Sequence, residues 1–395
     1  MHRNMKATHW LVVLGGVAML CGACGSTQAA ARNTTAASPT VWHFPTNPVT
    51  QPVTTVATGA RQSNQCAPVS PAPTLAPAVS SSRNLVIATL AGGSRYVVRD
   101  ITDINHPSTA STFEAPSQPK FVGAGDVSYV DGDGNVVRLT YASSRKLTVA
   151  RCVSLFDWSP DGTALAYLSE TDSGPELHLL RGGVDRSLGP IPQSGGGGCE
   201  SIAGCGIANS LDYRLSYSPD GAFISMVFNG FGKSVFRIWS SDGKPLESGD
   251  SKEFTMSAWS GSGLYFRDAQ GVSVWRAGNT SIFLPGVVWI RPHASPAGGQ
   301  IVYLSRDADG WGHISVVDTT TRVAREFKAH RSEPVFLTSR YVWYLGERDC
   351  VPADGCGSNP PFRPASGKTY IYDLQDGTET ASVIVSVLDV WPHAA

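Results

Sequence analysis

Charged residues are scarce in this chain of 395 residues, at 16% against about 25% in an average soluble domain. The two signs nearly cancel, with 31 Lys and Arg against 32 Asp and Glu, so no basic surface for nucleic acid is expected. No apolar run of 18 residues exists, which excludes a protein with several membrane-spanning helices. What is abundant is glycine, at 41 residues, and apolar residues, at 42%, which is enough for a large core.

The N-terminus has the features of an export signal. Positive charges in Met1–Lys6 precede Ala7–Leu20, an uncharged and mostly apolar stretch that is too short to cross a bilayer. Small residues occupy the two positions before Cys24, and this pattern resembles the lipobox of bacterial lipoproteins. The resemblance implies that residues 1–23 are a signal peptide and that Cys24 is lipidated, which places the protein outside the cytoplasm on the cell membrane. The alternative is cleavage within Thr27–Ala31, which releases a soluble secreted protein.

A low-complexity segment follows. Residues 24–82 contain eight prolines, ten threonines, two arginines and no acidic residue, and no apolar period runs through them. Such a segment has no core that offsets the entropy of ordering it. We therefore expect a disordered tether over 24–82 and a folded domain over 83–395.

Internal repeats determine the fold class. An aromatic or apolar strand ends in a tight turn in which Pro sets φ, Asp binds the turn backbone and Gly takes the left-handed conformation, and a second strand follows at once. The motif lies at Ser154–Gly162, Arg214–Gly221, Ser257–Gly263 and, more faintly, His293–Gly298. Each motif belongs to a unit of four short strands in about 40–45 residues, which is the length of a β-propeller blade.

The Trp158–Gly162 and Tyr217–Gly221 copies, both aromatic-Ser-Pro-Asp-Gly, resemble the TolB-type, WD-like propeller repeat of bacterial envelope proteins. The resemblance covers about Asn84–Ala395, and the helical N-terminal domain of TolB has no counterpart. It implies an all-β propeller but names no activity, because one propeller architecture hosts many.

Counting the units predicts seven blades, with six as the alternative. The first unit, Asn84–Thr112, supplies only three strands. The chain ends in Val387–His393, which matches an inner strand with its closing aromatic residue. We expect this C-terminal strand to complete the first blade, because ring closure pairs the edges that an open array exposes.

The cysteines predict three disulfides. Six remain for pairing once the signal peptide is removed and Cys24 is lipidated, and an even number in an oxidising compartment favours disulfides, although fifteen pairings are formally possible. Two pairs bracket short loops and the third joins the remaining residues, and we expect the pairs to be Cys199–Cys205, Cys350–Cys356 and Cys66–Cys152.

Long connections gather on one side of the predicted ring. In an up-and-down blade, the connections from the second to the third strand and from one blade to the next emerge together, on what we call the insertion side. The Ser-Pro-Asp-Gly turns emerge on the opposite turn side. Exposed aromatic and basic residues on the insertion side would form a recognition surface, unless they only cover neighbouring blades. The candidates are Phe231, Trp311, His313, Phe362 and Arg363.

No catalytic motif is recognisable. The chain has no G-x-S-x-G, Walker loop, H-E-x-x-H or C-x-x-C-H, so we expect no catalytic residues, no metal and no cofactor. Polar residues at inner-strand ends, Arg291 and His293 together with Arg214 and His393, are candidates for lining the centre of the ring.

These observations predict a non-catalytic, lipid-anchored, extracytoplasmic propeller that binds a protein, peptide or envelope polysaccharide. The alternative is a secreted propeller enzyme, a hydrolase or lyase that acts at the mouth of the central channel. The expected contact with the membrane is through the lipid only, and no nucleic acid is expected as a partner.

Overall fold

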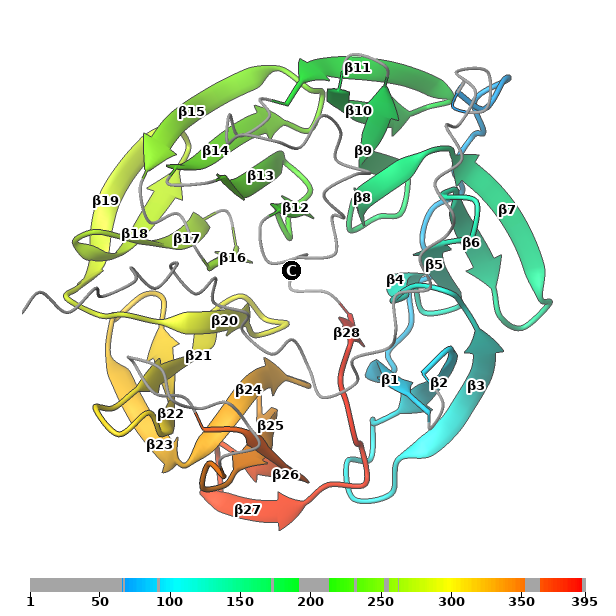
Figure 1. Ribbon diagram of the computed structural model, residues 1–395. Coiled ribbons are helices and arrows are strands. Elements are labelled where there is room, and N and C mark those ends of the chain that lie inside the picture. Colours follow the sequence, from blue (N-terminus) through cyan, green and yellow to red (C-terminus); the bar gives the residue numbers. More distant parts are fainter. Residues whose placement is uncertain are drawn as a thin grey trace, which may run out of the picture. The chain divides into compact units, whose positions relative to one another are not determined.

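Seven four-stranded antiparallel sheets surround one axis (Figure 1). This computed structural model describes Cys66 and residues 68–90, 93–171, 174–191, 213–230, 233–251, 256–261, 263–351 and 363–392. All of them belong to the second of two compact units, Thr46–Ala395. Within these residues, no helix is long and apolar enough to cross a membrane. The predicted all-β, seven-bladed propeller is confirmed.

Each blade is listed from its inner to its outer strand. Blade 1 has β28 (Asp389–Trp391), β1 (Leu85–Thr89), β2 (Arg95–Asp100) and β3 (Ser108–Glu114). Blade 2 has β4 (Lys120–Gly123), β5 (Asp126–Val130), β6 (Val136–Thr140) and β7 (Arg145–Ala150). Blade 3 has β8 (Val153–Trp158), β9 (Ala164–Thr171), β10 (Gly174–Arg181) and β11 (Val184–Pro190). Blade 4 has β12 (Tyr213–Tyr217), β13 (Phe223–Gly230), β14 (Lys233–Ser240) and β15 (Pro245–Ser251).

The remaining blades follow the same order. Blade 5 has β16 (Ser257–Ser260), β17 (Gly263–Asp268), β18 (Gly271–Arg276) and β19 (Asn279–Pro285). Blade 6 has β20 (Ile290–Ala294), β21 (Gln300–Arg306), β22 (Gly312–Asp318) and β23 (Ala324–Ala329). Blade 7 has β24 (Arg331–Phe336), β25 (Tyr341–Glu347), β26 (Ala365–Asp373) and β27 (Thr378–Ala381).

The C-terminal strand closes the ring as predicted. β28 pairs with β1, with Leu85 opposite Trp391 and Ile87 opposite Asp389. A carboxylate oxygen of Asp389 also accepts the Phe121 N–H of blade 2 at 2.6 Å. The same kind of bond joins blades 3 and 4, where Asp157 accepts the Tyr217 N–H at 2.8 Å. Side chains of one inner strand thus satisfy backbone donors of the next.

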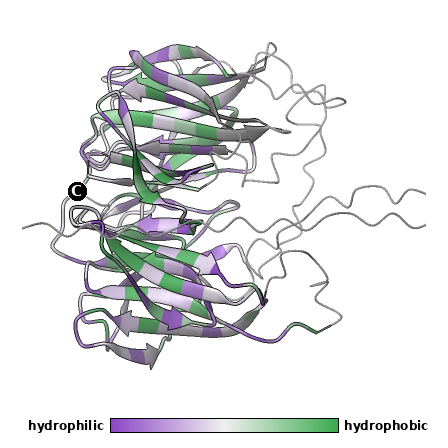
Figure 2. Ribbon diagram, turned by 90° about the vertical axis from the view of Figure 1, so that its left-hand side faces the viewer, coloured by the Kyte–Doolittle hydropathy of each residue, from purple (hydrophilic) through white to green (hydrophobic). Residues whose placement is uncertain are grey.

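Apolar clusters hold the blades together. The described residues form seven buried clusters, one at each junction between neighbouring blades. Along β1, Leu85 and Ile87 face blade 2 whereas Val86 and Ala88 face blade 7, since successive side chains point to opposite faces of a strand. A sheet covered on both faces needs continuous apolar strands, which is why the second strands, such as β1, β5 and β17, are buried over four consecutive residues. Figure 2 shows the apolar stretches within the strands and hydrophilic residues at many of the turns.

The repeated turns owe their geometry to side-chain hydrogen bonds. In blade 3 the Ser159 hydroxyl donates to Asp161 at 2.6 Å and accepts the Ala164 N–H at 2.8 Å. Gly162 has a φ of 68°, in the left-handed region where a side chain is disfavoured. Ser218, Asp220 and Gly221 repeat this arrangement in blade 4, with the same φ of 68°.

Part of the segment expected to be a disordered tether packs on the ring. Leu75 is only 6% exposed and belongs to the cluster between blades 2 and 3. The Ala78 N–H donates to the Asp161 carbonyl at 2.6 Å, and the Arg138 guanidinium donates to the Ala76 carbonyl at 2.8 Å. Residues 68–82 therefore form a strap along this junction. The expected boundary at Ser82 is corrected, because a few apolar residues find a groove that local composition does not reveal.

The strap begins at a disulfide. The structure joins Cys66 to Cys152, with Cα atoms 5.3 Å apart, at the start of blade 3. Cys350 is disulfide-bonded too, and its expected partner Cys356 lies outside the described residues. The expected Cys199–Cys205 pair and the lipidation site Cys24 also lie outside them.

Candidate functional site

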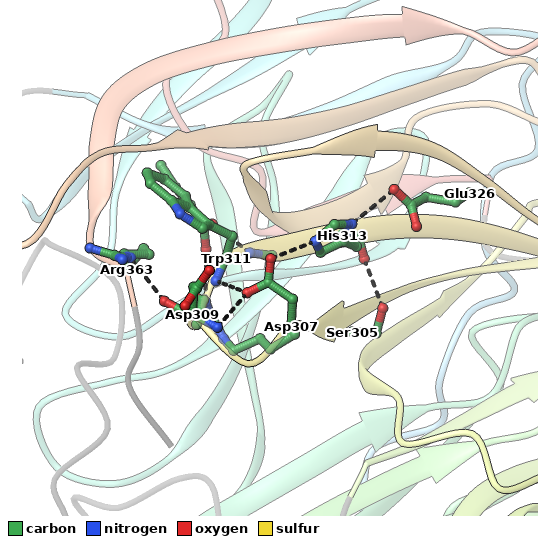
Figure 3. Close-up of polar contacts among 11 residues, drawn as sticks. Ser305, Asp307, Asp309, Trp311, His313, Glu326 and Arg363 are labelled. Atoms are coloured by element: carbon green, nitrogen blue, oxygen red, sulfur yellow. Dashed lines mark hydrogen bonds and ion pairs between the residues drawn. The ribbon is translucent and has the colours of Figure 1, made fainter. Parts of the chain in front are cut away.

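The connection between β21 and β22 is a tightly held loop on the insertion side (Figure 3). A carboxylate oxygen of Asp307 accepts the N–H groups of Asp309 at 3.0 Å and Trp311 at 2.8 Å. Gly312 has no room for a side chain, since a Cβ there would lie 2.1 Å from the carbonyl oxygen of Arg331. The carboxylate of Asp307 thus stabilises the backbone of its own turn by accepting two of its N–H groups.

This loop presents Trp311 to two partners. The indole stacks on the imidazole of His330, with ring centroids 4.0 Å apart and planes 16° apart. The Arg363 guanidinium lies 4.7 Å from the indole centroid and donates to the Asp309 carbonyl at 3.1 Å. Arg363 also lies 3.6 Å from an oxygen of Asp349. Trp311 and Arg363, two of the predicted residues, therefore lie together, and Trp311 is half-buried by contacts within the chain.

His313 extends the cluster outward. Its ring nitrogens lie 3.1 Å from Asp307 and 2.8 Å from Glu326 (Figure 3). The hydrogen bond with Glu326, and next that with Asp307, outweigh burial and raise the pKa of His313 above its usual 6.5. The same contact lowers the pKa of Asp307. His313 is thus a link between two carboxylates, which tie the loop to β23.

A second group of predicted residues lies at the insertion-side ends of the inner strands. The Arg291 guanidinium forms an ion pair with Glu333 of blade 7. Burial, and then the charges of Arg214 and Arg306, lower the pKa of Arg291 to about 10. Arg306 pairs with Glu347 at 3.0 Å. The charges of Arg214 and Arg306 therefore act on Arg291, and we call these three residues the arginine arc.

Arg214 has weaker contacts than its neighbours. It donates to the Ser257 carbonyl at 3.4 Å and to the Met256 sulfur at 3.8 Å. Burial lowers the pKa of Arg214. Among the described residues, no carboxylate lies within ion-pair distance of this guanidinium.

Unusual backbone conformations surround the arginine arc. Met256, Arg291 and Glu333 have φ values of 70°, 50° and 57°, a region that non-glycine residues rarely adopt. The β20–β21 ladder shifts register between Ile290 and His293 and the β24–β25 ladder between Ser332 and Val335, and such bulges turn side chains away from the regular direction. Each such φ costs about 1–3 kcal/mol and is typical of functional sites.

His293 has a structural contact. Its Nδ1 accepts the Phe336 N–H of blade 7 at 3.2 Å, as Asp157 and Asp389 do for their neighbouring blades. The remaining candidates, Phe231, Phe362 and His393, lie outside the described residues. Sequence reasoning missed His330, Arg306 and Glu347, because nothing local in the sequence connects them to Trp311 or Arg291.

A pocket of 240 Å³ lies on the turn side, between the Ser-Pro-Asp-Gly turns of blades 3 and 4. Its lining includes Asp161, Arg181, Tyr217 and Asp220. The buried Tyr217 hydroxyl has no hydrogen-bond partner among the described residues. Over the same part of the chain, no group of three or more His, Cys, Asp or Glu side chains is placed to hold a metal ion.

Comparisons with known proteins identify the fold of this chain but assign it to no family. No family model matches the sequence, and no curated protein does. Among solved structures, a prolyl endopeptidase is similar at 10% identity with a TM-score of 0.52, over 78% of this chain and 49% of that one. The propeller domain of the trilobed protease from Pyrococcus furiosus matches at 12% identity and a TM-score of 0.44, over 67% of this chain and 83% of that one.

TolB from Acinetobacter baumannii matches at 16% identity and a TM-score of 0.36, over 61% of this chain and 62% of that one. This chain therefore spans less than two thirds of TolB and about half of the prolyl endopeptidase. At such identities the similarity shows the fold alone, and these neighbours include both TolB and peptidase propellers. The chain is a seven-bladed β-propeller, and its similarity to the prolyl endopeptidase is one of fold alone.

Proposed function

We propose that this protein is a non-catalytic, extracytoplasmic binding module, anchored to the cell membrane by lipid on Cys24. In this proposal the insertion side of the propeller recognises a protein, peptide or envelope polymer. The observation that carries it is the arrangement around Trp311: a loop fixed by Asp307 and Gly312 that holds an indole against the guanidinium of Arg363.

Preorganisation of the side chains around Trp311 is the physical reason to expect a binding surface there. Side chains that are already held in position lose little entropy when a ligand binds, so more of the contact energy appears as affinity. Trp and Arg are also the residues that most often dominate binding energy at protein interfaces. Arg363 remains 24% exposed and His330 is exposed, so a ligand can reach this group from solvent.

The charges near the ring axis support recognition over proton transfer. Glu347 has a pKa raised by burial, as catalytic acids often do, but its side chain is 0% exposed and accepts the Gly312 N–H at 2.7 Å. It therefore holds the loop and is out of reach of a substrate. Glu333 in turn pairs with Arg291.

The test is ligand capture with matched variants. Full-length protein is immobilised and exposed to envelope proteins, peptides and glycans, beside a Trp311→Ala/Arg363→Ala variant. An Arg145→Ala variant, which removes an exposed arginine near the β6–β7 turn on the opposite side, is the control. We expect the double variant to lose at least tenfold in affinity for a specific ligand and the control to lose none. Equal binding by all three proteins would remove this surface from consideration.

Anchoring and disulfides are tested separately. We expect incorporation of labelled fatty acid into the wild-type protein and none into a Cys24→Ser variant. Unchanged labelling would exclude Cys24 as the lipidation site, and no labelling of either protein would favour the secreted alternative. Peptide mapping without reduction then checks the Cys66–Cys152 disulfide and the two pairs expected within loops.

A further inference from the structure

The pocket on the turn side lies where two copies of the repeated turn meet. Its volume is 240 Å³, and its described lining comes from the β8–β9 turn of blade 3 and the β12–β13 turn of blade 4, together with Arg181 at the end of β10 and Ser241 after β14. Sites for drug-sized ligands are larger, about 300–1,000 Å³. This pocket therefore has room for one small chemical unit.

The repeat explains why space is left at this junction. Between blades 2 and 3 the strap fills the corresponding place, since a Cβ on Gly162 would lie 3.0 Å from the Cβ of Ala78. At Gly221, the same glycine of the blade 4 turn, a Cβ would meet only the Cδ of Pro160, at 3.5 Å. All described lining residues belong to blades 3 and 4, so the strap does not close this pocket.

One wall of the pocket contains a hydroxyl without a partner. Tyr217 lines the pocket and is 6% exposed, and its hydroxyl makes no hydrogen bond with any described residue. Both turns lie wholly within the described ranges, so neither turn holds a partner out of view. Burial, and then the charge of Asp157, raise the pKa of Tyr217, so its phenol keeps its proton and can donate. A buried hydroxyl that makes no hydrogen bond is costly, and such groups are rare in folded proteins.

The rim of the pocket adds polar groups of both signs. The Arg181 guanidinium donates one N–H to the Ser241 carbonyl at 3.1 Å, and this single bond leaves most of its N–H donors unused by the described chain. Asp220 accepts the Ser218 hydroxyl at 2.6 Å and the Ala222 N–H at 3.0 Å with the same carboxylate oxygen. Arg181 and Asp220 are both exposed, so a ligand reaches them from solvent.

We propose that this pocket binds one sugar unit through its hydroxyl groups. A sugar hydroxyl donates and accepts hydrogen bonds at once, so it can pair with the Asp220 carboxylate, the Arg181 guanidinium or the Tyr217 phenol. An anion would face Asp161 and Asp220 and a cation would face Arg181, so a neutral polar ligand suits this mixture of charges best. The ring of Pro160 supplies an apolar wall for the C–H groups of the sugar.

This site goes beyond the binding surface proposed above. It lies on the turn side, whereas the Trp311 loop lies on the insertion side, so the two can be tested independently. The competing ligand is a zwitterion such as an amino acid, which would offer a carboxylate to Arg181 and an ammonium group to Asp220.

The probes are glucose, galactose and N-acetylglucosamine, with glycine as the competing zwitterion. Saturation-transfer NMR titrations are recorded on the full-length protein and on Tyr217→Phe, Arg181→Met and Arg145→Met. Arg145, an exposed arginine at the start of β7 in blade 2, provides the control. We expect at least one sugar to bind the wild-type protein and the control equally. Tyr217→Phe should bind it about three- to tenfold more weakly, and Arg181→Met at least about tenfold more weakly. Binding of glycine alone, or of no probe, overturns the proposal.

A second measurement distinguishes a hydroxyl that meets the ligand from one that is only sealed in the wall. Without sugar, Tyr217→Phe should melt at the same temperature as the wild-type protein or higher, because a buried polar group without a partner is removed. A lower Tm would mean that the hydroxyl has a partner within the protein, and equal sugar binding by Tyr217→Phe and the wild-type protein would mean that the ligand does not reach it. Either result overturns the proposal.

The Trp311→Ala/Arg363→Ala variant separates the two sites. It should bind the sugar as tightly as the wild-type protein does, whatever it loses in ligand capture. Loss of sugar binding in this variant would move the sugar site to the insertion side and overturn the assignment to the pocket.

Discussion

Removing the closing strand should unfold the ring. A variant that ends at Ser386 loses β28, in which Val390 is 5% exposed and Trp391 is 7% exposed. It also loses the Asp389 carboxylate that accepts the Phe121 N–H at 2.6 Å. Losing such side chains costs about 1.5–3 kcal/mol for the valine and about 3–5 kcal/mol for the tryptophan. A charge-assisted hydrogen bond contributes about 1.5–3 kcal/mol more.

The combined loss, about 6–11 kcal/mol, is comparable to the whole stability of a typical domain, about 5–15 kcal/mol. We therefore expect the variant to be largely unfolded at 25 °C or to melt at least about 12 °C lower, with a broadened transition. Circular dichroism and tryptophan fluorescence during heating and in urea measure this. A variant that ends at Pro392 keeps β28 and is the control. A single sharp transition within about 2 °C of the full-length protein would refute the view that β28 closes the ring.

Two further predictions concern single side chains. Because its carboxylate partners raise the pKa of His313, the contribution of this residue to stability is complete below pH 6.5, its usual pKa, and is lost as pH rises through the higher folded value. NMR titration should place the His313 pKa above 6.5, and the Tm of His313→Gln should lack this component of the pH dependence; a pKa at or below 6.5 contradicts the linkage. Leu75→Ala should destabilise the protein by about 2–5 kcal/mol in urea, because it empties a site between blades 2 and 3. Val79→Ala, where valine is 58% exposed, should change stability by less than about 0.5 kcal/mol, and an equally small effect of Leu75→Ala would mean that the strap is loose in solution.

Much of the fold was predictable because its information is local. Trp158–Gly162 and Tyr217–Gly221 each contain a strand end, a turn and the start of the next strand within a few residues. Ser159 and Asp161 make their hydrogen bonds with each other and with the adjacent backbone, so the motif specifies its geometry wherever it occurs. Closure was predictable as well, since Val387–His393 is an inner-strand pattern with no blade of its own.

The strap was not predictable from composition. Residues 68–82 are rich in proline and small residues, and their docking rests on Leu75 and on backbone bonds to Asp161 and Arg138. Those partners lie more than 60 residues away in sequence, so no local window contains the signal. The low average hydrophobicity of residues 68–82 suggested disorder, although a few specific contacts are enough to dock the segment on the ring.

The candidate site, like the fold, has features that the sequence predicts and others that only the tertiary structure reveals. The sequence by itself determined the repeat, the seven blades, the closing strand and the sides on which loops and turns emerge, because each follows from short-range patterns and from strand alternation. Tertiary structure alone decided that His330 stacks on Trp311, that Glu333 pairs with Arg291, and that the Tyr217 hydroxyl finds no partner among the described residues. These features arise between blades, and whether a polar group finds a partner depends on which side chains meet there, a property of the closed ring and not of any one stretch of chain.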